Sequence, residues 1–293
     1  MPDTTITSEP KVFKPPIKGQ SIHVDGKYYF IGDFIGKGYF GNVYECSDEW
    51  ENQLVAKVLV PRDQTYDEVR ESWLSELQKL EALRHPNITY VHAAFECEDT
   101  FYLVIERCSM TLDALINHEG LVADRWIPYV ARDILQGLEY VHSSGYIHKD
   151  IHPGNVFVSQ SQDRMVPTKE AVWSFKIGDL GISRLETELN AFNTILAQWM
   201  LPPEAIDPAE FGQVARTLDV YHVGLMLLAL ILKQIPTFTR EEVLAGLPRQ
   251  LAEESTSRYG PAIAKALRRH TASRTPTAMH FWRDIFAASQ SAP

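Results

Sequence analysis

The sequence is poor in cysteine and has no surplus of basic residues. Its three cysteines, Cys46, Cys97 and Cys108, are odd in number and do not follow the spacing of a metal site, so they fit reduced thiols in the cytoplasm. Against 28 Lys and Arg stand 38 Asp and Glu, which gives a formal net charge of −10. A general nucleic-acid-binding protein would show the opposite balance, and we therefore expect no nucleic-acid partner.

Long apolar segments are also lacking. The longest apolar run, residues 223–232, is shorter than the roughly 20 residues that a helix needs to span a bilayer. The first residues, Met1-Pro2-Asp3-Thr4, have neither the basic start nor the apolar core of a signal peptide. The sequence therefore predicts no membrane span and a cytoplasmic location.

What the chain does contain is the composition of an ordinary globular protein. Hydrophobic residues make up 45% and charged residues 23% of the 293 residues, which excludes disordered, collagen-like and coiled-coil proteins. At about 150 residues per domain, this length predicts two compact units or one bilobal unit. A chain of this size can bury a core without disulfides or a structural metal.

Strand-like patterns dominate the first third of the chain, and helical patterns dominate the rest. Short apolar runs bounded by turn residues predict strands, and apolar residues three or four apart predict helices. The predicted strands are residues 28–31, 42–46, 54–60, 89–95 and 101–105, and the predicted helices are residues 66–84, 123–143, 217–232, 239–253, 260–269 and 276–287. This order predicts an α+β fold, with a small antiparallel β-sheet lobe carrying one main helix and a larger, mainly helical lobe.

The domain limits follow from the same patterns. Residues 1–27 carry four prolines and show no periodicity, so we expect an N-terminal extension there rather than a domain. Residues 28–107 are predicted to form the strand-rich lobe and residues 108–290 the helical lobe. The boundary should fall near residues 106–110, where the last strand pattern ends.

A glycine-rich turn stands between the first two strand patterns. Glycines at the spacing of Gly36, Gly38 and Gly41 let a hairpin backbone lie close over a polyphosphate. The motif lacks the Gly-Lys-Ser/Thr ending of a Walker loop, and a strand rather than a helix follows it. Taken alone it is weak evidence for a nucleotide site, because turns use glycine in any case.

Two charged residues stand in apolar patterns. Lys57 interrupts the strand pattern of residues 54–60, and Glu76 lies beside the apolar stripe of the helix predicted at residues 66–84. A charge that points into a core is costly unless it meets an opposite charge. We expect the two residues to pair, although an edge lysine and a solvated glutamate would also fit each pattern.

The strongest chemical signal is a set of oxygen donors in order along the chain. Asp150 and Asn155 lie in a polar loop bracketed by strand-like runs, and Asp179 follows the next strand-like run. Carboxylate and amide oxygens are the ligands of Mg²⁺, which keeps waters and substrate phosphates. A further carboxylate has to accept or orient the proton of a nucleophile. Together with the glycine-rich turn, the set predicts a reaction on a magnesium nucleotide.

At this point the sequence resembles the eukaryotic-type protein kinase family over residues 30–287. Gly36, Gly38, Gly41 and Val43 match its glycine-rich loop, and Val55-Ala56-Lys57 matches its strand-three lysine motif. The catalytic loop is matched by His148-Lys149-Asp150 and Asn155, and the metal-binding motif by Asp179-Leu180-Gly181. Further matches are Pro202-Pro203-Glu204, Asp219 and Arg274.

The resemblance implies a role for each matched residue. Asp150, Lys57 and Glu76 are implied as catalytic residues, and Asn155 and Asp179 as ligands of Mg²⁺. The implied nucleotide-binding residues are Gly36, Gly38, Gly41, Val43, Ala56, Lys57, Ile105, Glu106, Cys108 and Phe157. Ile105 is expected as the gatekeeper, and the backbones of Glu106 and Cys108 are expected to face adenine. The expected reaction transfers the γ-phosphate of ATP to Ser or Thr hydroxyls of a protein substrate.

Some positions depart from the family pattern. Lys149 replaces the usual Arg, and a lysine cannot bind the phosphate of a phosphorylated activation loop through two parallel hydrogen bonds as an arginine does. His152 stands where Ser/Thr kinases carry a lysine, and Ala197 where they carry a threonine. In the family those two side chains meet near the catalytic aspartate, so the two changes leave the Ser/Thr assignment open.

Two other functions stay open alongside the leading one. The motif His148-x-Asp150-x-His152-Pro153-x-Asn155 also resembles the loop of aminoglycoside and choline kinases, which phosphorylate small molecules. Glu204, Asp219 and Arg274 argue against that branch, because such residues build the peptide-docking lobe of protein kinases. A pseudokinase scaffold that binds nucleotide without transfer is the third function, and the intact set of catalytic residues argues against it.

Overall fold

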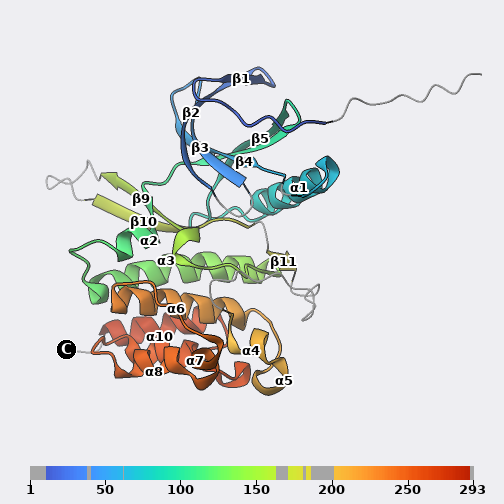
Figure 1. Ribbon diagram of the computed structural model, residues 1–293. Coiled ribbons are helices and arrows are strands. Elements are labelled where there is room, and N and C mark those ends of the chain that lie inside the picture. Colours follow the sequence, from blue (N-terminus) through green and yellow to red (C-terminus); the bar gives the residue numbers. More distant parts are fainter. Residues whose placement is uncertain are drawn as a thin grey trace, which may run out of the picture. The chain divides into compact units, whose positions relative to one another are not determined.

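The computed structural model describes residues 11–37, 41–61, 63–162, 171–180, 183–185 and 201–290 (Figure 1). Its internal contacts divide the chain into two compact units. The first, which we call the sheet unit, holds the chain up to Ala82 together with Tyr90–Arg107. The second, the helical unit, holds Leu83–Thr89 and the chain from Cys108 onward. The α+β fold predicted from the sequence is confirmed.

The described residues of the sheet unit form a six-stranded antiparallel sheet. The strand order is β1-β2-β3-β4-β6-β5. The strands are β1 (Ser21–Val24), β2 (Lys27–Lys37), β3 (Gly41–Asp48), β4 (Gln53–Leu59), β5 (Val91–Cys97) and β6 (Thr100–Glu106), and the helix is α1 (Tyr66–Ala82). Alternate side chains of these strands form one core, in which the rings of Tyr29, Phe95 and Tyr102 stack.

The core of the sheet unit also explains why the thiol of Cys46 stays protonated. Cys46 on β3 is buried, and burial together with the nearby Asp48 carboxylate raises the pKa of its thiol to about 12. The thiol is therefore neutral at physiological pH and behaves as a small apolar side chain. All three cysteines lie in the described ranges, and none of them forms a disulfide.

The first strand, β1, lies inside the segment that we expected to be an N-terminal extension. Ser21 pairs with Phe30, and Val24 pairs with Lys27, so residues 21–24 add an edge strand to the sheet. The turn between them is Asp25-Gly26, and both residues have positive φ, at 50° and 76°. An Asp-Gly pair with this backbone is typical of a two-residue hairpin turn. The segment before residue 28 therefore contributes one edge strand to the sheet.

Helix α1 ends two residues before the predicted residue 84. His85 and Pro86 follow, and the residue before a proline is disfavoured in the helical region. The buried residues of α1 include Glu76 and Leu80, on the face that contacts β5 and β6. The helix therefore presents a carboxylate to the interior, as its sequence pattern predicted.

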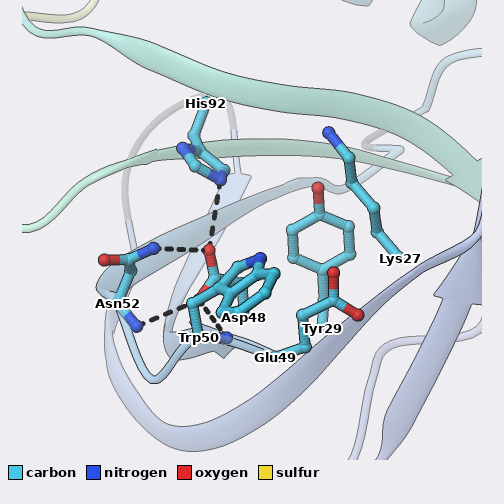
Figure 2. Close-up of a pocket in the computed structure, with 7 residues that line it drawn as sticks. All are labelled: Lys27, Tyr29, Asp48, Glu49, Trp50, Asn52 and His92. Atoms are coloured by element: carbon cyan, nitrogen blue, oxygen red, sulfur yellow. Dashed lines mark hydrogen bonds and ion pairs between the residues drawn. The ribbon is translucent and has the colours of Figure 1, made fainter.

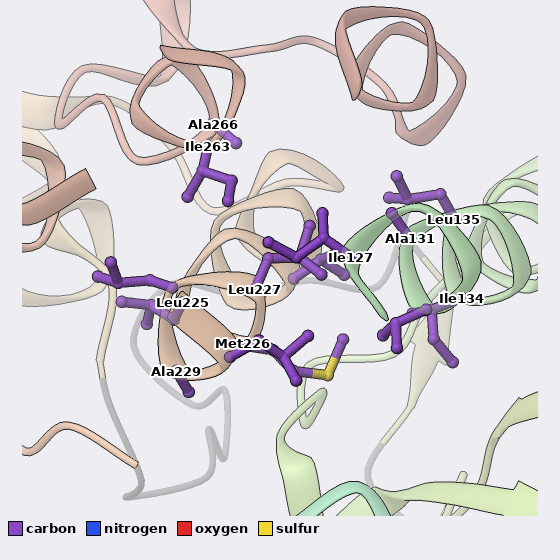
Figure 3. Packing of buried hydrophobic residues seen from close by; sticks show 14 of the residues in the cluster. Ile127, Ala131, Ile134, Leu135, Leu225, Met226, Leu227, Ala229, Ile263 and Ala266 are labelled. Carbon is purple, nitrogen blue, oxygen red and sulfur yellow. The ribbon is translucent and has the colours of Figure 1, made fainter. Parts of the chain in front are cut away.

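The helical unit is built around α6 (Thr217–Leu232). Its residues from Leu218 to Leu230 are all buried, which is why the sequence is apolar on every face of this helix. The other helices are α2 (Leu112–Ile116), α3 (Ala123–Ser143), α4 (Pro203–Ile206), α5 (Pro208–Phe211), α7 (Arg240–Ala245), α8 (Leu247–Glu254), α9 (Gly260–Ala266) and α10 (Ala278–Gln290). Figure 3 shows Ile127 of α3, Leu227 of α6 and Ile263 of α9 in one apolar cluster.

Short strands of the helical unit flank the polar loop that contains Asp150 and Asn155. The described strands are β7 (Met110–Thr111), β8 (Tyr146–Ile147), β9 (Val156–Gln162), β10 (Ala171–Ile177) and β11 (Arg184–Leu185). β9 lies between β7 and β10, and β8 pairs with β11. The turn of 3₁₀ helix at Pro153–Asn155 leads directly into β9. None of the helices in the described ranges is long and apolar enough to span a bilayer.

One predicted helix, residues 239–253, is two helices. α7 begins with a capping box between Thr239 and Glu242, and it ends at Gly246, whose φ of +87° is left-handed. α8 then starts at Leu247 with Pro248 in its first turn, a position where a missing N–H costs nothing. The apolar periodicity continues across the break, and for that reason the sequence pattern suggested a single helix.

A glycine sets the distance between α3 and the segment around Asn87. A Cβ on Gly137 would lie 2.8 Å from the carbonyl oxygen of Asn87 and 3.2 Å from its Cβ. The Asn87 amide is itself fixed, because its Nδ2 donates to the carbonyl oxygen of Phe175 at 2.9 Å. Neither neighbour can move away without breaking buried contacts.

We therefore expect Gly137→Ala to destabilise the protein, although alanine is the better helix former. The overpacking should lower the free energy of unfolding by about 1–3 kcal/mol in urea titrations. Gln136→Ala, at an exposed position of the same helix, is the control and should change it by no more than about 0.5 kcal/mol. Equal stability of the two variants would contradict this interpretation of the packing.

Candidate active site

Lys57 and Glu76 form a buried ion pair in the sheet unit. The Nζ of Lys57 lies 2.7 Å from Oε1 of Glu76, and the two side chains are 9% and 4% exposed. Lys57 is on β4, between Val43 of β3 and Leu103 of β6. Strands lie on both sides of Lys57, and the carboxylate of Glu76 on α1 holds its ammonium group in one position. The predicted pairing of these two residues is therefore observed.

The strands around Lys57 carry most of the residues expected to contact nucleotide. Val43 pairs with Gly36 on one side and with Lys57 on the other, and Ala56 is fully buried next to Lys57. A Cβ on Gly41 would overlap the carbonyl oxygen of Val58, so packing alone requires this glycine. Nothing lies within 4 Å of a Cβ built on Gly36, so packing does not explain that glycine.

Ile105 and Glu106 lie at the end of β6. Ile105 pairs with Val55 and Val91, and Glu106 pairs with Leu54. Glu106 binds Tyr90 twice, because its N–H donates to the Tyr90 carbonyl oxygen and its carboxylate accepts from the Tyr90 N–H. The sheet unit ends at Arg107, and Cys108 belongs to the helical unit.

In the helical unit, a buried aspartate fixes the backbone of the loop that begins at His148. Asp219 on α6 accepts hydrogen bonds from the backbone N–H groups of His148 at 2.9 Å and Lys149 at 2.8 Å. Its Oδ2 also lies 2.8 Å from Nε2 of His142. Lys149 has a left-handed φ of +71°, which its hydrogen bond to Asp219 stabilises.

The hydrogen bonds also decide the charge of Asp219. Burial by itself would raise the pKa of this carboxyl group, but the hydrogen bond from His142 and the nearby histidines bring the pKa below its ordinary value. The group is therefore a carboxylate at neutral pH, although it is fully buried. Its contribution to stability is present above the ordinary aspartate pKa and is lost as the pH falls below it.

His148 is a fully buried packing residue. Its Nδ1 accepts from the N–H of Asp150 at 3.2 Å, so the ring proton is on Nε2, which donates to the carbonyl oxygen of Gly178 at 3.1 Å. Burial lowers the pKa of the imidazole below its ordinary range. The neutral ring thus ties the segment before Asp150 to the residue before Asp179.

Asp150 and Asn155 are held together by direct hydrogen bonds. The Nδ2 of Asn155 donates to Oδ2 of Asp150 at 3.0 Å and to the Asp150 carbonyl oxygen at 3.1 Å. The Asn155 carbonyl oxygen in turn accepts from the N–H of Gly178 at 2.9 Å. These bonds hold Asp150, Asn155 and the residue next to Asp179 in one network.

This network suits a hard divalent cation. With its nitrogen committed to Asp150, Asn155 presents its Oδ1 as the atom that can bind a cation, and Asp179 supplies a carboxylate. No group of three His, Cys, Asp or Glu side chains that could hold a metal occurs in the described ranges. Amide and carboxylate oxygens are the types of ligand that Mg²⁺ takes, together with water and phosphate.

His152 lies beside Asp150. Its Nε2 is 3.6 Å from Oδ1 of Asp150, and its Nδ1 accepts from the N–H of Gly154 at 3.1 Å. Burial, together with the nearby His148 and His222, lowers the pKa of His152 to about 4. The imidazole is therefore neutral at physiological pH, unlike a lysine at this position. Ala197, Gly38 and Gly181, which the sequence also singled out, lie outside the described residues.

A second buried ion pair joins Glu204 of α4 to Arg274, 70 residues further along the helical unit. Nη1 and Nη2 of Arg274 lie 2.6 and 2.7 Å from the two carboxylate oxygens of Glu204, and both side chains are fully buried. The guanidinium also donates to the carbonyl oxygens of Thr217, Arg268 and Arg269. All five of its N–H groups therefore have partners.

A model of the protein kinase domain matches residues 29–288. The chain belongs to the protein kinase domain family. Three relatives are serine/threonine-protein kinase 1 of Arabidopsis thaliana, cell cycle serine/threonine-protein kinase CDC5/MSD2 of Saccharomyces cerevisiae and serine/threonine-protein kinase TAO2 of Homo sapiens. Members of this family use ATP as a substrate and a divalent metal ion.

The similarity to these relatives is confined to part of each one. The Arabidopsis protein is 29% identical over 68% of this chain and 22% of its own length. The yeast protein is 26% identical over 75% of this chain and 30% of its own length. The human protein is 29% identical over 72% of this chain and 16% of its own length. The chain thus spans less than a third of each of these relatives.

One hollow of this kinase domain contains none of the predicted site residues. It has a volume of about 160 Å³ and lies in the sheet unit (Figure 2). Its lining residues are Lys27, Tyr29, Asp48, Glu49, Trp50, Asn52 and His92. The Asp48 carboxylate there accepts from the N–H groups of Trp50 and Asn52 and from the Asn52 side chain, so it builds the β3–β4 turn.

Sequence reasoning missed His142 as a partner of Asp219. It lies in the last turn of α3, and its side chain is 1% exposed and contacts Asp219 of α6, 77 residues further along the chain. Within its own helix, His142 occupies an ordinary position on the buried face. Only the packing of α3 against α6 reveals that it contacts the residue that holds the loop.

Removing Arg274 should strongly destabilise the kinase domain. Arg274→Ala leaves the Glu204 carboxylate buried without its partner, so we expect the free energy of unfolding in urea to fall by about 3–5 kcal/mol. Arg249→Ala breaks an exposed pair, Arg249–Glu253, whose side chains are each 46% exposed, and should cost less than about 1 kcal/mol. Similar losses for the two variants would contradict this interpretation.

His152 should make the stability of the domain depend on pH. Because the folded-state pKa lies near 4, below the ordinary value of about 6.5, the unfolded chain takes up the proton first as the pH falls. The contribution of His152 to the free energy of unfolding is thus fully present above pH 6.5 and declines towards pH 4. In urea titrations between pH 7 and 4.5, His152→Gln should show a shallower decline than the wild type.

The control for this measurement is His118→Gln, which changes an exposed histidine and should keep the wild-type decline. Parallel curves for His152→Gln and the wild type would show that His152 does not contribute to the pH dependence.

Proposed function

We propose that this chain is a protein kinase that transfers the γ-phosphate of ATP to Ser or Thr hydroxyls of a protein substrate. The observation that carries this proposal is the loop network of the helical unit. There the Asp150 carboxylate is held by Asn155, and the backbone before it is held by the buried Asp219. A carboxylate fixed in this way can orient a hydroxyl and accept its proton.

The other catalytic residues have distinct proposed roles. Lys57 would bind the α- and β-phosphates of ATP, and Glu76 holds the ammonium in place for that contact. Asn155 and Asp179 would hold Mg²⁺ through their side-chain oxygens. When bound, the metal ion supplies compensation for the negative charge that develops on the phosphate oxygens.

The remaining proposed contacts are to the nucleotide itself. Gly36, Gly38, Gly41 and Val43 would cover the phosphates and sugar, and their place in the glycine-rich loop supports this role. The residues proposed around adenine are Ala56, Ile105, Glu106, Cys108 and Phe157. We further propose that residues 28–107 and 108–290 act as the two kinase lobes, preceded by an extension at residues 1–27.

Two observations support the choice of acceptor. The similar proteins from plant, yeast and human are all named serine/threonine-protein kinases. The buried Glu204–Arg274 pair also supports a protein kinase over a small-molecule phosphotransferase of the aminoglycoside or choline kinase type. The pair belongs to the lobe that the family resemblance associates with docking of peptides.

The cellular setting is part of the same proposal. Three cysteines that form no disulfide support a reducing compartment, which we take to be the cytoplasm. The acidic balance of the sequence, with a formal net charge of −10, supports a protein rather than a nucleic acid as the partner.

The test is transfer from radiolabelled ATP with Mg²⁺ to a generic basic protein and to the chain itself. Asp150→Asn keeps the size of the side chain but removes its basicity, so kcat should fall by about 10²–10⁴-fold while nucleotide binding persists. Glu119→Gln, an amide replacement at an exposed position of the same unit, should keep the wild-type rate. Phosphoamino-acid analysis of the product should show phosphoserine or phosphothreonine.

Other outcomes would contradict the proposal in different ways. Turnover on an aminoglycoside or amino alcohol, with no transfer to protein, would favour the small-molecule phosphotransferase. Binding of nucleotide with no transfer to any acceptor would favour a pseudokinase scaffold. Full activity of Asp150→Asn would remove Asp150 from the reaction.

A further inference from the structure

Residues 11–14 of the extension form hydrogen bonds with the turn between β5 and β6. The Nζ of Lys11 lies 2.7 Å from Oδ1 of Asp99, and the N–H of Val12 donates to its Oδ2 at 3.2 Å. The N–H of Lys14 donates to Oγ1 of Thr100 at 3.0 Å, and this hydroxyl lies 3.0 Å from the Lys14 carbonyl oxygen. We call residues 11–14 the N-terminal clamp.

The anchor of the clamp is Thr100. This residue is fully buried, and its hydroxyl reaches both backbone polar groups of Lys14. By contrast, the Lys11–Asp99 pair is exposed to 50% and 27%, and exposed ion pairs contribute little to stability. Phe13 is partly buried against the core of the sheet, which adds an apolar contact between the two polar ones.

Charge complementarity favours this placement of the clamp. The turn and the strand before it carry Glu96, Glu98 and Asp99, and the clamp brings Lys11 and Lys14 to them. Glu98 and Asp99 both have a positive φ, at 50° and 59°, which is the backbone of a two-residue hairpin turn built without glycine. Hydrogen bonds from the clamp to Asp99 and Thr100 hold this turn in place.

The clamp also contacts helix α1. The Nζ of Lys11 lies 5.1 Å from the centre of the Tyr66 ring, and Tyr66 is the first residue of α1. The Tyr66 hydroxyl donates to Oε1 of Glu96 on β5 at 2.6 Å, and its ring packs against Phe101 of β6. The start of α1 is therefore attached to the same hairpin that the clamp binds.

A second attachment lies one helical turn before Glu76. The Trp73 ring packs against Phe101, with ring centres 5.2 Å apart, and its Nε1 donates to the carbonyl oxygen of Tyr102 at 3.1 Å. Tyr66 and Glu76 are about 15 Å apart along a stiff helix, so a shift of the hairpin at one end carries the other end with it. Glu76 holds Lys57 at that other end.

We propose that the N-terminal clamp positions α1, so that Thr100, Lys11 and Tyr66 act as positioning residues for the Lys57–Glu76 pair. This inference rests on the proposed kinase function for its effect on activity. Without the clamp, the β5–β6 hairpin and the start of α1 lose their contacts to residues 11–14, and the pair spends less time assembled.

Two changes to the full chain test the clamp. Deletion of residues 1–14 removes it entirely, and Thr100→Val removes only the hydroxyl that anchors it. We expect hydrogen exchange of the α1 amides, residues 66–82, to become at least about threefold faster in both variants. The kcat for transfer from ATP should fall about three- to tenfold, with a smaller change in the KM for ATP.

Two further variants are controls. Thr100→Ser keeps the hydroxyl and should retain the wild-type kcat and α1 exchange. Lys18→Ala breaks another exposed ion pair of the extension, Lys18–Asp33, with 2.7 Å between its atoms and no contact to α1 among the interactions of the described residues. It should behave like the wild type. If Thr100→Val fails to fold, the deletion variant and Lys11→Ala provide the same two readouts.

The possible results separate the clamp from the proposed function. Unchanged hydrogen exchange of α1 in the deletion variant would overturn the proposal that the clamp positions α1. Faster hydrogen exchange with an unchanged kcat would also overturn it. If the wild type transfers no phosphate to protein, the proposed function fails. The exchange of α1 then still decides the clamp, since faster exchange supports it and unchanged exchange overturns it.

Discussion

The carboxylate of Asp219 has no access to water, and three hydrogen-bond donors from α3 and from the loop after β8 surround it. A buried charge is tolerated only when its hydrogen bonds are complete, so the loop backbone cannot leave this arrangement without exposing an unpaired carboxylate. His148, Asp150 and Asn155 take their positions from a backbone whose left-handed residue, Lys149, is held by the same aspartate.

Two buried ion pairs also show that a buried charge needs a partner. Lys57 and Glu76 are 19 residues apart, in a strand and a helix of the sheet unit. Glu204 and Arg274 are 70 residues apart in the helical unit. The arginine pair is fully enclosed and uses every donor of its guanidinium, as expected of a structural element. The lysine pair keeps slight exposure on each side chain, which agrees with the proposed contact of Lys57 with ATP.

Much of this organisation could be predicted from the sequence, because it depends on local pattern. The limits of α3 and α6 were predicted to the residue, since each is a long apolar segment with a helical pattern. The pairing of Lys57 with Glu76 could be predicted because each charge stands in an apolar pattern that allows it only with a partner. The break at Gly246 and the strand at Ser21–Val24 were missed, although Gly246, Pro248 and the Asp25-Gly26 turn were visible in the sequence.

The sequence by itself determined the fold class, the family and the identity of the candidate catalytic residues, because these depend on residue type, order and spacing. The tertiary structure alone showed His142 against Asp219 and the neutral ring of His152 beside Asp150. It also showed residues 11–14 bound to the β5–β6 turn and to the start of α1. The physical reason is the range of the contacts. Such bonds join residues that are far apart in the chain, and they leave no local periodicity, because each depends only on where the folded backbone brings the two partners.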